Sequence, residues 1–526
     1  MPILTSIISW LNVKRISEIE LMRKYPHNVQ EETFFKLIEK AKDTIWGKDH
    51  NYENIRSLDD FQKNVPLQDY EDIKPYINRL RDGERDLLWP GEIKWFAKSS
   101  GTTSDKSKFI PVSSEALEEC HFQAGKDNIA LFASRNPDTE IFSGKTLILG
   151  GSHNINNFTN QSYYGDLSAV LIQNLPFWAE FIRTPSIQTA LMDKWDDKID
   201  KLTEEAINVN VTTLAGVPSW MLVLAKNILK VTGKKTLKEV WPNLELFSHG
   251  GVSFTPYKEE FDRLIGYENM KYVETYNASE GFFSIQDSND DNSMLLMLDY
   301  GIFYEFIDTN EIGNESCTII GIKDVKLNVN YALIISTNSG LWRYEIGDTI
   351  KFTSLFPHKI KVTGRIKHFI NAFGEELIID NAEQAVQKAC QDSGAVIIEY
   401  TACPIYMSNN QKGAHQWLFE FSKNPIDMEF FMEILDNKLK DLNSDYEAKR
   451  FKDISLEQPK YNILKEGVFY AWLKNKDKLG GQHKIPRLAN HRQYVEELLS
   501  LQDSIYINDN NLSDRSKLID YFNKKI

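Results

Sequence analysis

The feature that most constrains the fold is an alternation of helix-like and strand-like stretches between residues 196 and 275. β-branched and apolar runs predict buried strands at 209–215, 244–247 and 271–275, and amphipathic runs beside them predict helices. Such alternation favours a sheet covered by helices, because a parallel connection needs a covering segment between its strands. We therefore predict an α/β architecture for this part of the chain.

The pattern changes twice further along. Residues 282–362 contain six short strand-like runs in succession, which predict an antiparallel or barrel-like β portion. After the Gly364-Arg365 pair, helix-like and strand-like runs predict a compact α+β region of the size expected for an independent unit. We predict a large N-terminal domain, residues 1–365, and a smaller C-terminal domain, residues 366–526.

Composition excludes several kinds of partner and site. The formal net charge of −14 argues against a nucleic acid or an anionic membrane surface as the main partner. The apolar N-terminus lacks the features of a signal peptide, and no apolar run approaches the ~18 residues needed to span a membrane. The four cysteines, at positions 120, 317, 390 and 403, are widely spaced, which is typical of reduced thiols. We therefore expect Cys120, Cys317, Cys390 and Cys403 to be free thiols of a cytoplasmic protein.

A loop rich in hydroxyl groups is the first candidate site. Residues 98–112 read KSSGTTSDKSKFIPV, so four hydroxyl side chains surround Gly101 and two lysines follow. Hydroxyls, free backbone N–H groups and ammonium groups suit the oxygens of a polyphosphate. A plain polar hairpin loop would have the same composition, so this stretch alone does not decide between the two.

Several common catalytic motifs are missing. The nearest approach to a P-loop is Gly144-Lys145-Thr146, but residue 139 is threonine where the first glycine is required. The sequence has no H-E-x-x-H, G-x-G-x-x-G or G-x-S-x-G pattern. The sequence therefore does not carry the motifs that usually indicate a metalloprotease, a dinucleotide-dependent enzyme or an esterase.

Four further polar motifs follow predicted strands or a domain boundary. Residues 276–281 (YNASEG) follow the strand 271–275, at the strand end where open α/β sheets bind ligands. In that motif an aromatic ring suits a purine, a hydroxyl suits phosphate and a carboxylate suits Mg²⁺. The others are 249–251 (HGG), 344–348 (YEIGD) and 364–370 (GRIKHFI). Each could also be an ordinary turn or linker when it is considered alone.

Taken in order, the five motifs resemble those of the adenylate-forming enzymes, and more narrowly the auxin-responsive acyl acid amido synthetases (the Gretchen Hagen family). The resemblance runs from about residue 90 to residue 490, and residues 367–376 (KHFINAFGEE) are similar to its bacterial branch. It implies a large N-terminal α/β domain that binds ATP and an acyl group, and a small mobile C-terminal lid domain. Two departures are Asp105, where plant relatives tend to have glycine, and Glu345, where the family usually has arginine.

The resemblance also implies roles for individual residues, carried over by motif. Lys108 would be the loop lysine, Glu280 would hold Mg²⁺, and Lys484 would be the mobile lysine of the C-terminal domain; these three are the implied catalytic residues. The implied ATP-binding residues are Ser99, Ser100, Gly101, Thr102 and Thr103 for phosphate, Gly251, Val252 and Tyr276 near the adenine, Ser279 at a phosphate, and Asp348 and Arg365 at the ribose.

The acyl-binding residues are less clear from the sequence. Candidates are Phe122 and Gly125, in the predicted helix 114–135 after the loop, and Val217 and Trp220, in the turn that opens the next predicted helix. Apolar residues on helices are more often plain core, so ordinary packing remains an alternative for all four.

The implied reaction joins a small carboxylic acid to an amine, usually an amino acid, through an acyl-adenylate. ATP and Mg²⁺ are the expected cofactors, the small-molecule acid and amine are the expected partners, and a monomer or weak homodimer is expected. An acid–thiol ligase that uses coenzyme A and a non-catalytic nucleotide-binding protein remain alternatives. The sequence does not name the acid or the amine.

Overall fold

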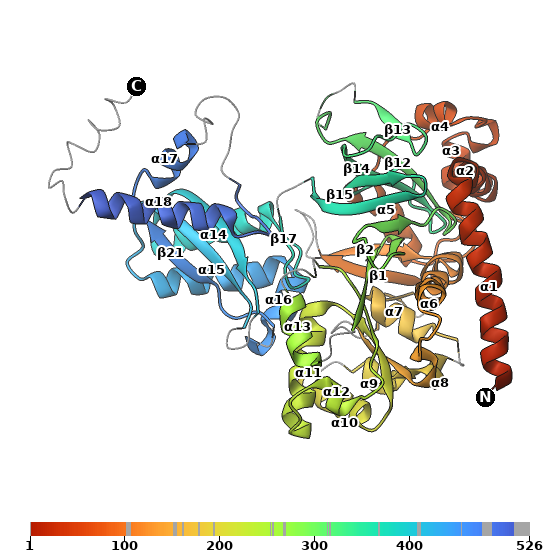
Figure 1. Cartoon of the computed structure of the whole chain (residues 1–526). Helices are drawn as coiled ribbons and strands as arrows, with labels where there is room; N and C mark the ends of the chain where they lie inside the picture. The colour runs from red at the N-terminus through yellow and green to blue at the C-terminus, as the bar shows by residue number, and fades with distance from the viewer. Residues whose placement is uncertain are drawn as a thin grey trace. The chain divides into compact units, whose positions relative to one another are not determined.

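The structure is a computed structural model that describes residues 2–509, apart from 101–106, 151–154, 160–161, 177–178, 193–194, 253, 255–256, 267–269, 313, 315–316, 367–368, 408–411, 454 and 476–485. The chain divides into two compact units, Met1–Ile366 and Lys367–Ile526, here called the N-terminal and C-terminal units. In Figure 1 the N-terminal unit runs from red to green and the C-terminal unit is blue. Within the described residues, no helix is both long and apolar enough to cross a membrane.

A sheet of twelve strands organises the N-terminal unit, in the order β13-β12-β14-β15-β16-β11-β10-β9-β8-β7-β3-β6. Its strands are β3 (Lys145–Leu149), β6 (Arg183–Thr184), β7 (Val211–Gly216), β8 (Leu246–Gly250), β9 (Lys271–Ala278), β10 (Gly281–Gln286), β11 (Met294–Leu296), β12 (Ile302–Asp308), β13 (Ile319–Gly321), β14 (Asn330–Thr337), β15 (Tyr344–Leu355) and β16 (His358–Arg365). The pairs among β6, β3, β7, β8 and β9 are parallel, and all pairs from β9 onward are antiparallel.

This topology confirms the predicted α/β architecture and refines two expectations. The predicted antiparallel strands are present. They continue the parallel sheet through the pair β9–β10, so the parallel and antiparallel strands form one sheet. The strand predicted to end at residue 275 continues through Ala278, so the prediction that Tyr276 follows the strand is wrong. Local apolar patterning ends at residue 275, but pairing with β10 extends the backbone ladder by three residues.

A second, four-stranded sheet carries the hydroxyl-rich region, in the order β2-β1-β5-β4. Its strands are β1 (Trp95–Ser100), β2 (Ser107–Val112), β4 (Asn156–Asn157) and β5 (Tyr163–Asp166). The helices of the unit are α1 (Pro2–Lys24), α2 (Pro26–Ala41), α3 (Ile45–Asp49), α4 (Leu58–Asn64), α5 (Tyr70–Arg81), α6 (Gln123–Arg135), α7 (Leu167–Gln173), α8 (Ala179–Ile182), α9 (Ile187–Ala190), α10 (Trp195–Ile207), α11 (Pro218–Thr232), α12 (Leu237–Val240) and α13 (Lys258–Ile265). Helices α10 to α13 gather at one end of the unit (Figure 1).

The helix predicted over 114–135 is interrupted in its first half. Residues Ala116–Phe122 form a π-helical segment, and the α-helix α6 begins only at Gln123. The Ser113 hydroxyl accepts the Ala116 N–H at 2.9 Å and so caps this helical stretch. The backbone N–H of Phe282 donates to Cys120 Sγ at 3.3 Å, which fixes the π-helical segment against β10. π-Helical turns are frequent at functional sites.

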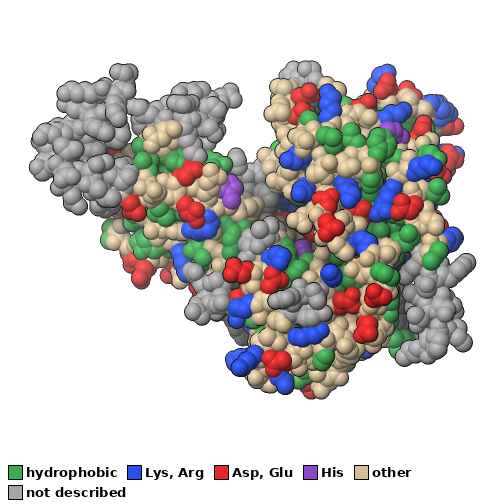
Figure 2. Space-filling view, viewed as in Figure 1, with side chains coloured by type: hydrophobic (Ala, Val, Ile, Leu, Met, Phe, Trp, Pro, Cys, Tyr) green, Lys and Arg blue, Asp and Glu red, His purple; other side chains and the backbone are tan. Residues whose placement is uncertain are grey.

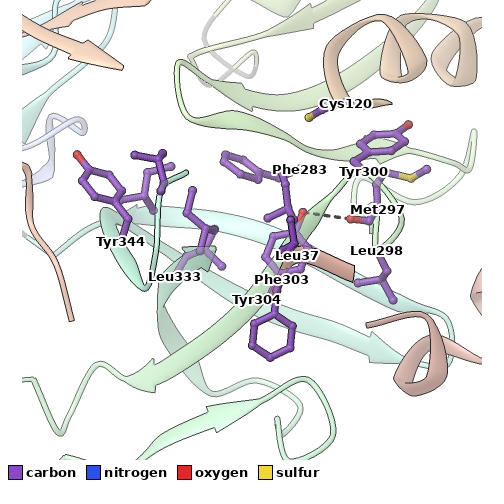
Figure 3. Close-up of a cluster of buried hydrophobic side chains, with 14 of the residues drawn as sticks. Leu37, Cys120, Phe283, Met297, Leu298, Tyr300, Phe303, Tyr304, Leu333 and Tyr344 are labelled. Carbon is purple, nitrogen blue, oxygen red and sulfur yellow. Dashed lines mark hydrogen bonds between the residues drawn. The ribbon is translucent and has the colours of Figure 1, made fainter. Parts of the chain in front are cut away.

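A large aromatic and aliphatic cluster fills the N-terminal unit. Figure 3 shows part of it, where the Tyr304 hydroxyl donates to the Met297 carbonyl oxygen at 3.1 Å. On the face drawn in Figure 2, the Lys and Arg side chains of the unit are interspersed with Asp and Glu. Neighbouring charges of opposite sign partly cancel, so this face has no extended field of one sign.

The C-terminal unit is a separate α+β body. Its strands are β17 (Phe369–Ile370), β18 (Leu377–Ile378), β19 (Val396–Ile405), β20 (Ala414–Lys423) and β21 (Lys460–Leu464), of which the last three form one sheet. Its helices are α14 (Ile379–Ser393), α15 (Met428–Leu442), α16 (Ser444–Arg450), α17 (Val468–Asn475) and α18 (Gln493–Asp509). A buried contact of 2.7 Å joins His415 Nε2 and Glu375 Oε1 in its interior.

Candidate functional site

The hydroxyl-rich stretch connects two paired strands. Strands β1 and β2 are antiparallel, with Ser99 opposite Lys108 and Ser100 opposite Ser107. The predicted phosphate residues Gly101, Thr102 and Thr103 lie outside the described residues. The hairpin therefore fixes where the loop starts and ends, and it puts Lys108 directly beside the first hydroxyl residue.

The turn between β9 and β10 presents the second motif. Ala278 pairs with Gly281, so Ser279 and Glu280 are the two turn residues of a tight β-hairpin. Both side chains are partly exposed at the end of β9. A carboxylate at such a turn can bind a metal ion or solvent without disturbing the strands that support it.

A buried carboxylate joins three of the predicted residues. The Tyr276 hydroxyl donates to Asp348 Oδ2 at 2.6 Å, and Arg365 Nε donates to Asp348 Oδ1 at 2.7 Å. Tyr276 and Asp348 are both buried. Asp348 and Arg365 face each other across the antiparallel pair β15–β16, so the sheet register sets this ion pair. Each carboxylate oxygen keeps a further lone pair with which it can accept another donor.

Glu280 lies close enough to this cluster to affect it electrostatically. Burial raises the pKa of Tyr276 well above its usual range, and the negative charges of Asp348 and Glu280 raise it further. Burial likewise raises the pKa of Tyr344, with Glu280 as the strongest charged contributor. Both phenols therefore stay protonated and can act as hydrogen-bond donors at neutral pH.

Lys108 approaches the same region from the hairpin. Its Nζ lies 5.7 Å from the ring centroid of Tyr70, whose hydroxyl accepts the Phe109 N–H at 2.8 Å. Tyr70 in turn is one of the groups that act on the Tyr344 hydroxyl. Tyr276, Asp348 and Arg365 are thus in direct contact, and the charge of Glu280 acts on Tyr276. Lys108 is linked to this group through Tyr70, which acts on Tyr344, although the residues are spread over more than 250 positions of sequence.

The end of β8 carries the His-Gly-Gly motif. A Cβ built on Gly250 would lie 2.5 Å from the backbone oxygen of Thr275 on β9, so only glycine fits this close strand approach. Gly251 has a φ of +82°, and a Cβ there would lie 3.4 Å from Val217 Cγ2. This contact puts the predicted adenine residue Gly251 beside the predicted acyl residue Val217. The buried Val252 follows.

The acyl candidates lie on two helices near this strand end. Asn128 Nδ2 on α6 donates to Ser248 Oγ on β8 at 2.6 Å, which ties the helix of Phe122 and Gly125 to the strand that leads into Gly251. Gly125 is exposed, and a Cβ built there meets nothing within 4 Å. Trp220 is buried in the first turn of α11. Open space beside Gly125 is compatible with a pocket wall, and the acyl-binding roles of all four residues stay predictions.

Three buried histidines make the stability of the N-terminal unit depend on pH. Burial lowers the pKa of His121 to about 4, of His249 to about 3 and of His358 to about 4, from an ordinary value of 6.5. The folded chain keeps these rings neutral, while an unfolded histidine takes up a proton below about pH 6.5. Stability from this source is complete above that pH and is lost as the pH falls toward 4.

We expect His249→Gln to flatten this pH dependence. When the unfolding free energy is plotted against pH, each such histidine contributes up to ~1.4 kcal/mol per pH unit to the slope. Denaturant unfolding of the full chain between pH 7 and pH 5 would measure the slope for the wild type and the variant. Equal slopes would contradict a neutral, buried His249.

The predicted site residues divide into three groups. The first group is Tyr276, Asp348 and Arg365, which contact one another, with Glu280 and Lys108 linked to them electrostatically and through Tyr70. Ser99 and Ser279 lie on the supporting hairpins. The second group lies on the neighbouring strand end and helices: Gly251, Val252, Val217, Trp220, Phe122 and Gly125. Gly101, Thr102, Thr103 and Lys484 lie outside the described residues, and Ser100 is described only by its backbone.

Sequence reasoning assigned no role to Tyr70, Asn128 or Tyr344. Tyr70 begins α5, and in the sequence it is one of the apolar residues at helical spacing with Ile73 and Ile77, which indicates only a packing role. Asn128 lies inside a helix and has no local signal. Tyr344 was quoted only as the first residue of a motif.

The residues present suit ATP and Mg²⁺. In the described part of the chain, no group of three or more His, Cys, Asp or Glu could hold a metal ion by itself. Mg²⁺ is usually bound through one or two carboxylates together with substrate phosphates, so a single carboxylate such as Glu280 fits that mode. Asp348 offers free lone pairs to a pair of hydroxyl donors, and Lys108 offers a cation to phosphate.

Comparisons with known proteins point to one family. Sequence models of the GH3 family N-terminal, central and C-terminal domains match residues 15–270, 295–365 and 380–493. Indole-3-acetic acid-amido synthetase GH3.3 of Arabidopsis thaliana is 21% identical over 567 residues, which cover 93% of each chain. The 4-substituted benzoates-glutamate ligase GH3.12 of the same plant is 22% identical over 518 residues, which cover 83% of this chain and 88% of the relative.

Solved structures share the fold. The AtGH3.15 acyl acid amido synthetase in complex with 2,4-DB superposes with a TM-score of 0.59 at 18% identity, covering 92% of this chain and 95% of the other. A 2-hydroxyisobutyryl-CoA ligase with its adenylate and CoA has a TM-score of 0.51 at 13% identity, covering 93% and 92%. The fold is thus that of the adenylate-forming enzymes. Because all three domains of one family match in order along the chain, this protein belongs to the GH3 family.

Proposed function

We propose that this protein is an ATP-dependent acyl acid amido synthetase, a ligase that forms a carbon–nitrogen bond. It adenylates a small carboxylic acid and transfers the acyl group to an amine, with an amino acid as the expected acceptor. The products are an amide, AMP and pyrophosphate. The observation that carries the proposal is the hydrogen-bonded group of Tyr276, Asp348 and Arg365, on which the charge of Glu280 acts, in a GH3 family chain.

The first step is the attack of a carboxylate oxygen on the α-phosphorus of ATP, which releases pyrophosphate. Charge builds on phosphate oxygens during this step, so positioning and electrostatic stabilisation supply most of the catalysis. We assign phosphate binding to Lys108 and the loop that follows Ser99, and ribose binding to Asp348 supported by Arg365. Mg²⁺ held by Glu280 would neutralise phosphate charge.

The second step is the attack of the amine on the carbonyl carbon of the acyl-adenylate, which releases AMP. We assign the C-terminal unit to a lid role and Lys484 to the closed state, where its ammonium would reach the α-phosphate or the carboxylate. We further propose that the protein acts in the cytoplasm as a monomer or weak homodimer. These assignments rest on the family motifs and on the two compact units of the chain.

Exchange of labelled pyrophosphate into ATP tests the proposal. We expect exchange that depends on an added carboxylic acid and on Mg²⁺, and a panel of aromatic and aliphatic acids would identify the acid. If ATP binds but no acid supports exchange, the protein is a nucleotide-binding protein without catalysis. Where exchange occurs, adding amino acids or coenzyme A in turn separates amide formation from thioester formation.

The variant Gly125→Ala tests the acyl assignment. Gly125 is the third residue of α6, and the π-helical segment precedes it, so the position is inside a continuous helical stretch. Alanine there meets no neighbouring atom within 4 Å and should stabilise the helix by about 0.5–1 kcal/mol. If Gly125 lines the acyl pocket, the added methyl group should raise the KM for the acid while the KM for ATP stays the same. A stabilised variant with an unchanged KM for every acid would remove Gly125 from the pocket.

A further inference from the structure

The hydroxyl group of Tyr344 is buried without a partner. The side chain is 0% exposed, and its Oη has no hydrogen-bond partner among the described residues. A buried hydroxyl that is left unpaired is costly, and native proteins pair the large majority of such groups. In Figure 3 the ring lies at the margin of the hydrophobic cluster, and its oxygen points away from Leu333 and Phe283.

The groups around this hydroxyl belong to the candidate site. The charged and ionisable groups that act on it are, from the strongest, Glu280, Tyr70, Asp69 and Arg365. Tyr70 lies beneath the ammonium group of Lys108. Tyr344 begins β15, the strand that also carries Asp348. The hydroxyl is therefore within electrostatic reach of the phosphate-binding candidates, whereas the rest of the ring packs in the core.

The two buried tyrosines, Tyr276 and Tyr344, have different charged neighbours. The hydroxyl of Tyr276 donates to Asp348, the ribose candidate, at 2.6 Å. The strongest charged neighbour of the Tyr344 hydroxyl is instead Glu280, the candidate for Mg²⁺ and the phosphates. A neutral phenol is a suitable donor there, because it adds a hydrogen bond to phosphate beside a carboxylate without needing a counter-ion of its own.

We propose that the Tyr344 hydroxyl donates a hydrogen bond to a phosphate oxygen of the bound nucleotide, so that Tyr344 is a further nucleotide-binding residue. This assignment rests on the proposed function. It explains why a costly buried hydroxyl is kept at a position where phenylalanine would fill the same space.

The variant Tyr344→Phe removes only this hydroxyl and tests the assignment in the full chain. We expect the affinity for ATP with Mg²⁺, measured by calorimetry without an acid, to fall about tenfold or more, as for a lost hydrogen bond to a charged group. The affinity for adenosine should not change, because adenosine has no phosphate. The Tm should stay the same or rise, because the variant removes a polar group that has no partner within the fold.

Tyr304→Phe is the matched control. Tyr304 is equally buried, but its hydroxyl donates to the Met297 carbonyl oxygen within the hydrophobic cluster (Figure 3). In the described part of the chain, no candidate site residue is among the charged groups that act on it. We expect this control to lower the Tm and to leave ATP affinity unchanged.

Three results would overturn the assignment for Tyr344→Phe: unchanged ATP affinity, an equal loss of adenosine affinity, or a Tm loss like that of the control. If the wild-type chain does not bind ATP at all, the proposed function fails and the assignment fails with it. The two kinds of failure are therefore distinguishable, because the first three results require a wild type that binds ATP.

Discussion

Replacing Glu280 by alanine is expected to lower acid-dependent pyrophosphate exchange by ~10²-fold or more at fixed Mg²⁺, because its carboxylate would hold the ion that stabilises transition-state charge. Glu280 occupies a two-residue hairpin turn and is partly exposed, so its loss should leave the Tm nearly unchanged. The effect would therefore be on catalysis and not on folding. Exchange rates measured over a range of Mg²⁺ concentrations would test this, since weaker metal binding moves the half-saturation point upward.

Glu39→Ala provides a matched control for this experiment. Glu39 is an exposed carboxylate on α2, and within the described part of the chain its ion pair is with Lys42, one turn away. Surface pairs of this kind contribute little, so both the exchange rate and the Tm should match the wild type. An unchanged exchange rate in Glu280→Ala would remove Glu280 from the site.

Replacing Asp348 by alanine is expected to have two large effects. The variant would lose the acceptor for the ribose hydroxyls, which should raise the KM for ATP by ~10²-fold, the loss expected for two charged hydrogen bonds at the low end of their range. It would also leave the Tyr276 hydroxyl and the Arg365 guanidinium without their shared carboxylate, which should cost about 1–3 kcal/mol of unfolding free energy.

Comparing the affinities for ATP and for 2′,3′-dideoxy-ATP separates the ribose contact of Asp348 from the effect of Asp348→Ala on folding stability. The wild type should bind ATP more tightly than 2′,3′-dideoxy-ATP, while Asp348→Ala should bind the two with similar affinity. Calorimetry at a temperature where both proteins are folded would measure the four affinities. If the variant still prefers ATP by the wild-type factor, Asp348 is a structural partner of Tyr276 and Arg365 only.

The sequence predicted most of the local structure around the site. Apolar runs located the strands β7 and β8 to within a few residues and predicted helices beside them, as the structure shows. The end of β9 was missed, because Tyr276, Asn277 and Ala278 do not continue the apolar pattern. Pairing with β10 keeps these residues in the strand, and that pairing is a long-range property of the sheet.

The π-helical segment was also beyond the reach of the sequence. Residues 114–135 have ordinary helical spacing, and nothing in that spacing marks the insertion of a wider turn. The contact between Cys120 and the backbone of Phe282 accompanies it, and the two residues are separated by more than 160 positions. A local pattern cannot report such a contact.

By itself the sequence determined the family, the order of the motifs and the chemical type of each candidate residue, since these depend on which side chains follow one another along the chain. Only the tertiary structure decided which of them meet. Tyr276, Asp348 and Arg365 come together because β9, β15 and β16 belong to one sheet whose register sets Asp348 opposite Arg365. The same packing buries the Tyr344 hydroxyl within electrostatic reach of Glu280, because strand pairing and core packing act between segments that are distant in sequence.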